Sequence, residues 1–193
     1  MEWLKIIVDN ALANMAKEKI LMTTPWDVPA EMLDKSMTTA AEDWKCWKPI
    51  DSIVTDDDIN KFEINIGIGL PLSYREFLKY KHFYVLRIPD KAVNLPGHLP
   101  DKNLPALRDF VFNHNEPELL IGRRYINFAD FHDYGHLCFD ANAPARDNEY
   151  KVVYINYENL DDIHFYANNF RELLEGDREK GNDFIDRLNE YYR

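Results

Sequence analysis

Apolar residues recur at helical spacing in the first part of the chain, which opens with a predicted amphipathic helix. Within residues 2–20, the side chains that share one face are Leu4, Val8, Ala11, Leu12 and Met15. A short helix is predicted to start at Pro29, and three tryptophans are expected to clamp this segment onto the core: Trp26, Trp44 and Trp47. Residues 1–46 are therefore interpreted as a helical extension packed on a main domain of residues 47–193.

Two further helices follow, and the residues at their ends identify them. Thr55 is a favourable N-cap, and Asp58 three positions later completes a capping box. The apolar stripe of this helix consists of Ile59, Phe62 and Ile66. Gly67 is expected to end it, because glycine adopts the left-handed conformation without steric cost. Ser73 and Glu76 offer a capping box to the next helix, whose buried face consists of Tyr74, Phe77 and Leu78.

The second half of the chain alternates between strand-like and helical patterns. The predicted strands are FYVLRI (83–88), ELLIGRRYINF (118–128), YGHLCFDA (134–141) and EYKVVYIN (149–156). The predicted helices are residues 104–115, LDDIHFYANNFRELLEG (160–176) and NDFIDRLNEYYR (182–193). Helices, then consecutive strands, then helices indicate an α+β fold with a mainly antiparallel sheet.

Charge narrows the range of partners. Acidic residues outnumber basic ones by 34 to 23, which gives a formal net charge of −11. Nucleic-acid backbones and anionic membranes are bound by clustered Lys and Arg, so both are disfavoured as partners. The basic doublet Arg123–Arg124 is expected on a strand, where its side chains point to opposite faces. A basic protein partner is favoured instead, because opposite charges speed encounter and exclude wrong partners.

The location is expected to be the cytoplasm. Cys46 and Cys138 lie far apart without a CxxC context and are interpreted as buried thiols in a reducing compartment. The N-terminus has charges inside its apolar run, unlike a signal peptide. No apolar run approaches the roughly 20 residues of a membrane span.

Catalytic signatures are scarce in this sequence. His132 and His136 have the i, i+4 spacing of metal ligands on a helix, but Gly135 lies between them and the flanking residues alternate like a strand. A strand would place His136, Cys138 and Asp140 on one face. No nucleophile elbow and no phosphate-binding glycine loop is present. The sequence therefore predicts no enzyme, no metal and no cofactor.

Several motifs occur in a fixed order along residues 44–176: WKPI, a capped helix ending in KFE, an LP pair, SYREFLKYKHF, INFADFHDYGHLCFD, DNEYKVV and NFRELL. Together they resemble the SUKH superfamily, which is named for a yeast regulator of cell-wall glucan synthesis and killer-toxin resistance. The resemblance implies a sheet with helices packed against one side. It also implies structural roles for Trp47, Pro49, Glu63, Gly67, Leu70, Pro71, Tyr74, Phe77 and Leu78, with Glu63 as the partner of a turn or a Lys.

The same resemblance carries an expectation about function. Many bacterial members of the superfamily resemble immunity proteins, which bind and neutralise toxins that are often nucleases. We therefore predict a binding module that neutralises a basic toxin domain. The alternatives are a signalling scaffold linked to cell-wall glucan synthesis and a metalloenzyme using His132 and His136. Acidic loop residues near the sheet edge are the expected partner contacts: Asp101, Asp133, Asp140, Asp147 and Glu149.

Overall fold

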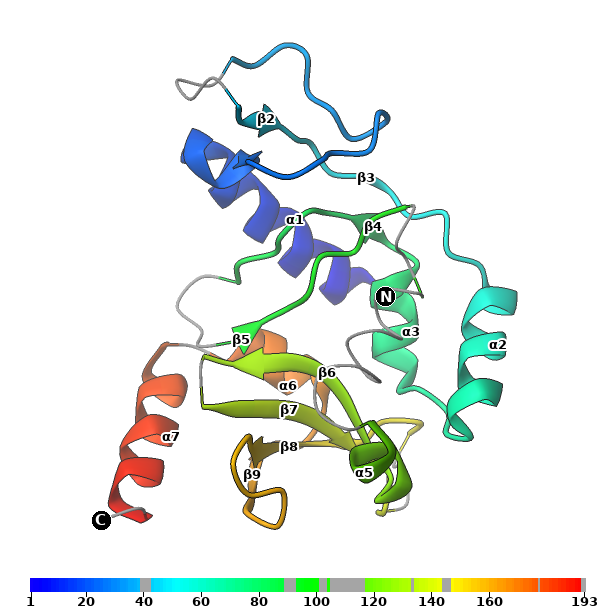
Figure 1. Ribbon diagram of the computed structural model, residues 1–193, viewed down its shortest axis with the longest axis vertical. Coiled ribbons are helices and arrows are strands. Elements are labelled where there is room, and N and C mark those ends of the chain that lie inside the picture. Colours follow the sequence, from blue (N-terminus) through cyan, green and yellow to red (C-terminus); the bar gives the residue numbers. More distant parts are fainter. Residues whose placement is uncertain are drawn as a thin grey trace.

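A five-stranded antiparallel sheet forms in the described residues and occupies the lower half of Figure 1. Each strand pairs with its neighbours in sequence, in the order β5 (Val93–Asn94), β6 (Tyr125–Phe131), β7 (Gly135–Asp140), β8 (Lys151–Asn156) and β9 (Ile163–Ala167). The computed structural model describes residues 1–38, 43–88, 93–100, 104, 117–132, 134–143, 147–176 and 178–191. The predicted α+β class with a mainly antiparallel sheet is confirmed.

Several helices pack around this sheet. They are α1 (Glu2–Lys17), the 3₁₀ helix η1 (Lys19–Met22), α2 (Asp56–Ile66), α3 (Leu72–Leu78), α5 (Pro117–Gly122), α6 (Phe170–Glu175) and α7 (Arg178–Tyr191). In Figure 1, α2 and α3 lie side by side at the right, and α6 lies behind the sheet. Two short hairpins pair β1 (Thr23–Thr24) with β2 (Lys45–Cys46), and β3 (Ile50–Asp51) with β4 (Lys81–His82).

An aromatic cluster holds α3 and α6 against one face of the sheet. The ring of Tyr74 on α3 contacts the rings of Phe128 on β6, Phe139 on β7 and Phe170 on α6, with centroids 5.1–5.6 Å apart. Phe128 and Phe139 stack across the β6–β7 pair at 4.0 Å. Burial raises the pKa of Tyr74 far above its usual range, because the phenolate would be desolvated. Edge-to-face packing of this kind adds to the burial of apolar area.

The predicted alternation along β7 is confirmed. Leu137 and Phe139 face the large core, whereas Cys138 packs with Leu120 of α5 and Val153 of β8 in a smaller cluster on the opposite face. The helix α5 therefore covers part of the face that α3 and α6 leave uncovered.

Apolar spacing predicted α1 correctly, and the residues at its ends predicted α2. All five apolar residues expected on one face of α1 are buried. In α2, the Thr55 hydroxyl accepts a hydrogen bond from the Asp58 backbone N–H at 3.2 Å, and the Asp58 carboxylate accepts one from the Thr55 N–H at 3.0 Å. Gly67 follows at φ 69°, in the left-handed region. The capping box and the glycine stop are both confirmed.

The helix predicted over residues 160–176 is wrong in its first half. Residues Ile163–Ala167 form the strand β9, which pairs with β8, and only Phe170–Glu175 are helical. The Asn169 side chain accepts a hydrogen bond from the Glu172 N–H at 2.8 Å and so begins α6. Backbone pairing with β8 thus overrides an apolar spacing that also fits a helix.

Three further strand assignments need correction. The run 118–128 begins as α5, so only its end lies in β6. Arg123 and Arg124 belong to the turn between these elements, with Arg124 at φ 64°, and not to a strand. The run 83–88 makes only isolated bridges, Phe83 with His98 and Leu86 with Leu95.

The segment after α1 also differs from its prediction. No helix forms within the described residues 29–38, where the chain makes a turn and Leu33 bridges to Trp47. Trp47 is fully buried and anchors this segment, whereas Trp26 is 69% exposed and Trp44 is 37% exposed. The helix predicted over 104–115 lies outside the described residues, apart from residue 104.

Candidate functional site

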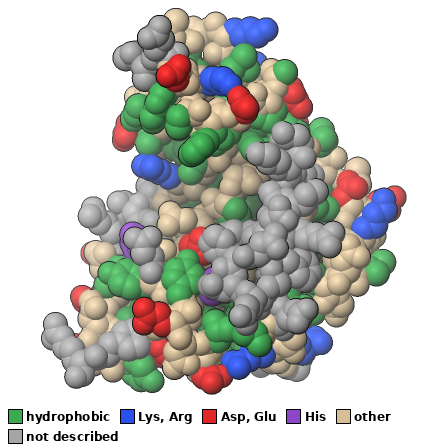
Figure 2. Space-filling view, in the orientation of Figure 1, with side chains coloured by type: hydrophobic (Ala, Val, Ile, Leu, Met, Phe, Trp, Pro, Cys, Tyr) green, Lys and Arg blue, Asp and Glu red, His purple; other side chains and the backbone are tan. Residues whose placement is uncertain are grey.

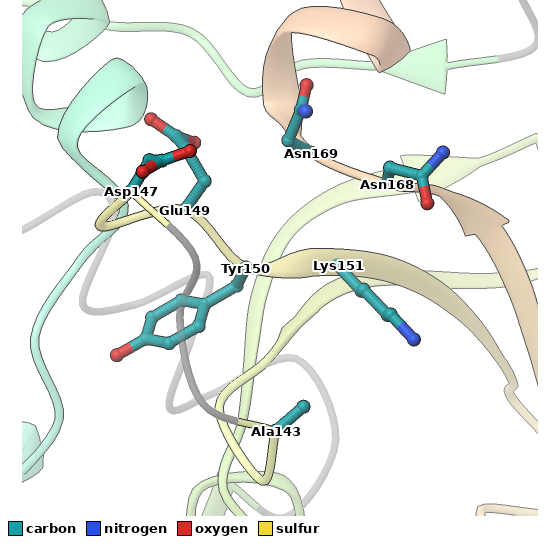
Figure 3. Close-up of a pocket in the computed structure, with 7 residues that line it drawn as sticks. All are labelled: Ala143, Asp147, Glu149, Tyr150, Lys151, Asn168 and Asn169. Carbon is teal, nitrogen blue, oxygen red and sulfur yellow. The ribbon is translucent and has the colours of Figure 1, made fainter.

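Three neighbouring cavities share lining residues where the turn between α2 and α3 meets the segment before β8. The first, about 600 Å³, is lined by Asn60, Glu63, Ile64, Gly67, Ile68 and Gly69. The second, about 330 Å³, is lined by Glu63, Gly69, Leu70, Leu72, Arg75, Asn148 and Tyr150. The third, about 860 Å³, is lined by Ala143, Asp147, Glu149, Tyr150, Lys151, Asn168 and Asn169 (Figure 3). Shared lining residues connect each cavity to the next, and we call the whole the lateral groove.

Glu63 holds the α2–α3 turn at one end of the lateral groove. One carboxylate oxygen accepts a hydrogen bond from the Leu70 backbone N–H at 2.7 Å, and the other pairs with the Arg75 guanidinium at 2.6 Å. The expected role as the partner of a turn is confirmed, although its cation is an arginine of α3 and not a lysine. Both oxygens of Glu63 are therefore engaged within the protein.

Glu149 closes the lateral groove from the other side by capping α3. Its carboxylate accepts hydrogen bonds from the Ser73 backbone N–H at 2.8 Å and from the Ser73 hydroxyl at 2.6 Å. The Asn148 carbonyl accepts another from the Leu72 N–H at 2.9 Å. The predicted capping box of Ser73 with Glu76 is wrong, because Glu149 supplies the acceptor and Glu76 pairs with Lys79 at 2.7 Å.

Of the five predicted partner contacts, three lie in the part of the chain that the structure describes. Asp147 and Glu149 both line the third cavity, while Asp140 lies beside it, opposite Lys151 in the β7–β8 pair. Asp140 accepts hydrogen bonds from Asn142 and so shapes a turn. Asp101 and Asp133 lie outside the described residues.

Asp147 differs from the other acids of the lateral groove. It is exposed and takes φ 53°, followed by Asn148 at φ 59°, so the backbone turns sharply there. Its side chain makes no hydrogen bond or ion pair with a described residue. Figure 3 shows the Asp147 and Glu149 carboxylates on one side of the cavity and Asn168 on the other, while the Lys151 side chain points away from the acids.

The rim of the lateral groove also exposes two aliphatic side chains that sequence reasoning missed. Ile64 of α2 is 79% exposed and lines the first cavity, and Leu72 of α3 is 40% exposed and lines the second. The sequence could have indicated that Ile64 is exposed, because it does not belong to the apolar stripe that α2 buries. Single exposed apolar residues are common, so Ile64 matters here because it lines a cavity of the lateral groove.

The two histidines of the predicted pair lie in different environments. His132 lies in the turn after β6 at φ 46°, whereas His136 is buried in β7, where its Nδ1 atom is 2.9 Å from the Asn127 side-chain nitrogen. His136 also packs against the Tyr157 ring at 4.5 Å. Within the part of the chain that the structure describes, no three His, Cys, Asp or Glu side chains are arranged to hold a metal ion.

Basic side chains are dispersed over the face seen in Figure 2 and do not gather into a patch among the atoms described there. Of the described helices, none combines the length and the apolar character needed to cross a membrane.

The comparisons with known proteins place these elements in a family. The sequence profile of the SMI1/KNR4 family (SUKH-1) matches residues 53–176, more than half of the chain. The chain belongs to this family. A comparison with curated proteins found no match. The SUKH-1 match begins just before α2 and ends just after α6, so it includes every residue of the lateral groove and excludes α1 and α7.

The positions expected to be structural in this SUKH-1 chain fall into two groups. Trp47, Leu70, Pro71, Tyr74, Phe77 and Leu78 are buried, and Pro49 is half-buried. Glu63, Gly67 and Leu70 also line the lateral groove. Some of the residues that carry the resemblance therefore build the walls of the groove as well as the core.

Proposed function

We propose that this SUKH-1 protein is a non-enzymatic binding module, an immunity protein that neutralises a basic toxin domain by docking it on the lateral groove. One observation carries the proposal: the groove is an elongated surface with exposed aliphatic side chains on its rim and an acid, Asp147, free of described partners. Buried apolar contacts supply affinity at such surfaces, and charge supplies orientation and speed.

The charge of the chain and its cysteines support this role. A net charge of −11 attracts a basic partner such as a nuclease, whose own surface must bind phosphates. Cys46 and Cys138 are both buried and unbridged, as expected for a protein that acts in the reducing cytoplasm, where an intracellular toxin must be met.

Growth rescue tests the proposal directly. Each gene product encoded next to this chain is expressed alone and together with the full-length protein, and any toxic product is purified and titrated against the protein by calorimetry. We expect restored growth and a one-to-one complex whose affinity falls as salt is raised. If no neighbouring product is toxic, or if toxicity persists on co-expression, the immunity role is rejected in favour of the scaffold role in cell-wall synthesis.

The metalloenzyme alternative has its own measurement. Purified protein is analysed for bound metal, before and after dialysis against a chelator. Zinc at one equivalent per chain that is lost in His136→Gln would overturn the non-enzymatic assignment, whereas we expect no stoichiometric metal.

A further inference from the structure

We infer that the lateral groove accepts an extended segment of the partner in which an aliphatic side chain is followed or preceded, a few residues away, by an arginine or lysine. The aliphatic side chain packs between Ile64 and Leu72, and the cation pairs with Asp147. This inference rests on the proposed function and specifies the chemistry that the partner must present.

The aliphatic half follows from the exposure of Ile64 and Leu72. The stripe that α2 buries is complete without Ile64, which therefore contributes nothing to the core. Leu72 sits one residue beyond Pro71, at the first turn of α3, with its backbone already fixed by the bond to Asn148. Both side chains stand on rigid helix ends, so a partner side chain that packs on them meets a preformed surface.

We infer the basic side chain of the partner from which polar groups of the lateral groove already have hydrogen-bond partners within the protein. The carboxylates of Glu63 and Glu149 already bond to Leu70, Arg75 and Ser73. The amide groups at the far wall are also engaged, since Asn168 donates to Glu172 and the Asn169 side chain accepts from the Glu172 N–H. Asp147 is left as the carboxylate that faces the cavity without a described partner, and it selects a positive charge.

The order of the cavities sets the spacing of the two features. Ile64 lines the first cavity, Leu72 the second and Asp147 the third, and Tyr150 is shared by the last two. A segment that crosses from one end to the other must therefore bridge the second cavity. An extended peptide covers about 3.3 Å per residue, so a few residues separate the aliphatic and cationic side chains.

A library experiment tests this chemistry without knowledge of the partner. Phage displaying random twelve-residue peptides are selected on the immobilised full-length protein, and enriched peptides are synthesised and measured by fluorescence anisotropy. We expect a consensus with one aliphatic and one basic position, and binding that weakens about tenfold for Ile64→Asp and several-fold for Asp147→Asn. Asparagine is chosen because it tolerates the left-handed backbone at this position.

Matched variants and a coupling measurement make the outcome decisive. Ile6→Asp on α1 and Asp183→Asn on α7 make the same kinds of change at exposed residues away from the groove, and binding should stay within about twofold of wild type. Replacing the basic residue of the peptide by Gln should cost nothing further in Asp147→Asn. Failure to enrich a consensus, equal binding to Ile64→Asp, or independent effects of the two charge changes would each overturn the inference.

The two proposals fail separately. Toxin neutralisation that survives Ile64→Asp and Asp147→Asn retains the immunity role and rejects this use of the lateral groove. A confirmed peptide consensus without any neutralised toxin retains the groove chemistry and rejects the immunity role.

Discussion

Glu149 caps the helix that contains Ser73 from a position 76 residues further along the chain, with both carboxylate oxygens engaged at 2.8 and 2.6 Å. This contact ties the start of α3 to the segment that leads into β8. Because Glu63 fixes the preceding turn through Leu70, two carboxylates hold opposite sides of the lateral groove. The shape of the lateral groove should therefore depend on both carboxylates, Glu149 and Glu63.

Removing the Glu149 carboxylate should destabilise the fold. In Glu149→Ala the Ser73 N–H and hydroxyl lose their acceptor at the start of α3, and we expect a loss of about 1–2 kcal/mol in the free energy of unfolding. Urea denaturation followed by circular dichroism measures it. Glu158→Ala, an exposed change in the β8–β9 turn, is the control and should lie within about 0.5 kcal/mol of wild type. Equal stabilities for the two variants would refute the capping role.

Two glycines should respond to alanine in opposite directions. Gly67 has φ 69°, which disfavours any L side chain, so Gly67→Ala should cost about 1 kcal/mol. Gly181 lies inside α7 with no atom within 4 Å of an added Cβ, so Gly181→Ala should stabilise the protein by up to about 1 kcal/mol. Both values come from urea denaturation, and a stabilising Gly67→Ala would contradict the left-handed turn.

The pair His82–His98 should make stability depend on pH in the mildly acidic range. Burial, aided by the neighbouring His82 ring at 4.5 Å, lowers the pKa of His98 from 6.5 to about 4. The folded pKa lies below the unfolded one, so this contribution is fully present above pH 6.5 and is lost as the pH falls toward 4. The loss should be on the order of 2–3 kcal/mol.

Nuclear magnetic resonance and denaturation check this titration. The His98 ring should remain neutral until the pH approaches 4, because burial and the neighbouring His82 ring disfavour its charged form more than the hydrogen bond from Nε2–H to the Leu78 carbonyl, at 2.7 Å, favours it. The free energy of unfolding should decline between pH 6.5 and 4, and less steeply in His98→Gln. His132→Asn, a change at an exposed turn, should retain the wild-type slope. A normal pKa for His98 would disprove the prediction.

Sequence reasoning succeeded where the determining contacts are local. The caps of α2 lie within a dozen residues, so Thr55 and Gly67 could be interpreted without knowing the fold. It failed where the deciding contact is distant. Residues 163–167 have apolar spacing that suits a helix, and only pairing with β8 makes them a strand. The cap of α3 likewise cannot be predicted from nearby residues, because Ser73 bonds to the distant Glu149 and not to Glu76.

The candidate site shows the same limit. Asp147 and Glu149 were both expected to contact a partner, and both line the lateral groove. Their difference, one carboxylate engaged by Ser73 and the other without a described partner, depends on which helix the segment before β8 packs against. Charge alone could not distinguish the two residues, whereas the contact with Ser73 shows that Glu149 serves the fold.

The last prediction concerns α7, which lies beyond the SUKH-1 match but packs on the sheet. The Phe184 ring contacts the rings of Phe131, Tyr154 and Tyr166 with centroids 4.9–5.5 Å apart. Phe184→Ala should therefore cost about 3–5 kcal/mol, the usual penalty for removing a buried aromatic ring. Burial already raises the pKa of Tyr166 to about 12, and exposure of its ring should lower that value toward 10.

Urea denaturation and a spectrophotometric tyrosine titration measure the two effects in Phe184→Ala. Asp186→Ala, an exposed change two residues away on the same helix, is the matched control and should alter neither. A loss of less than about 1 kcal/mol in the free energy of unfolding would mean that α7 contributes little to the stability of the core. The expected loss, with a lowered tyrosine pKa, would make this helix part of the core, because a helix of its length is marginal in water unless its apolar face is buried.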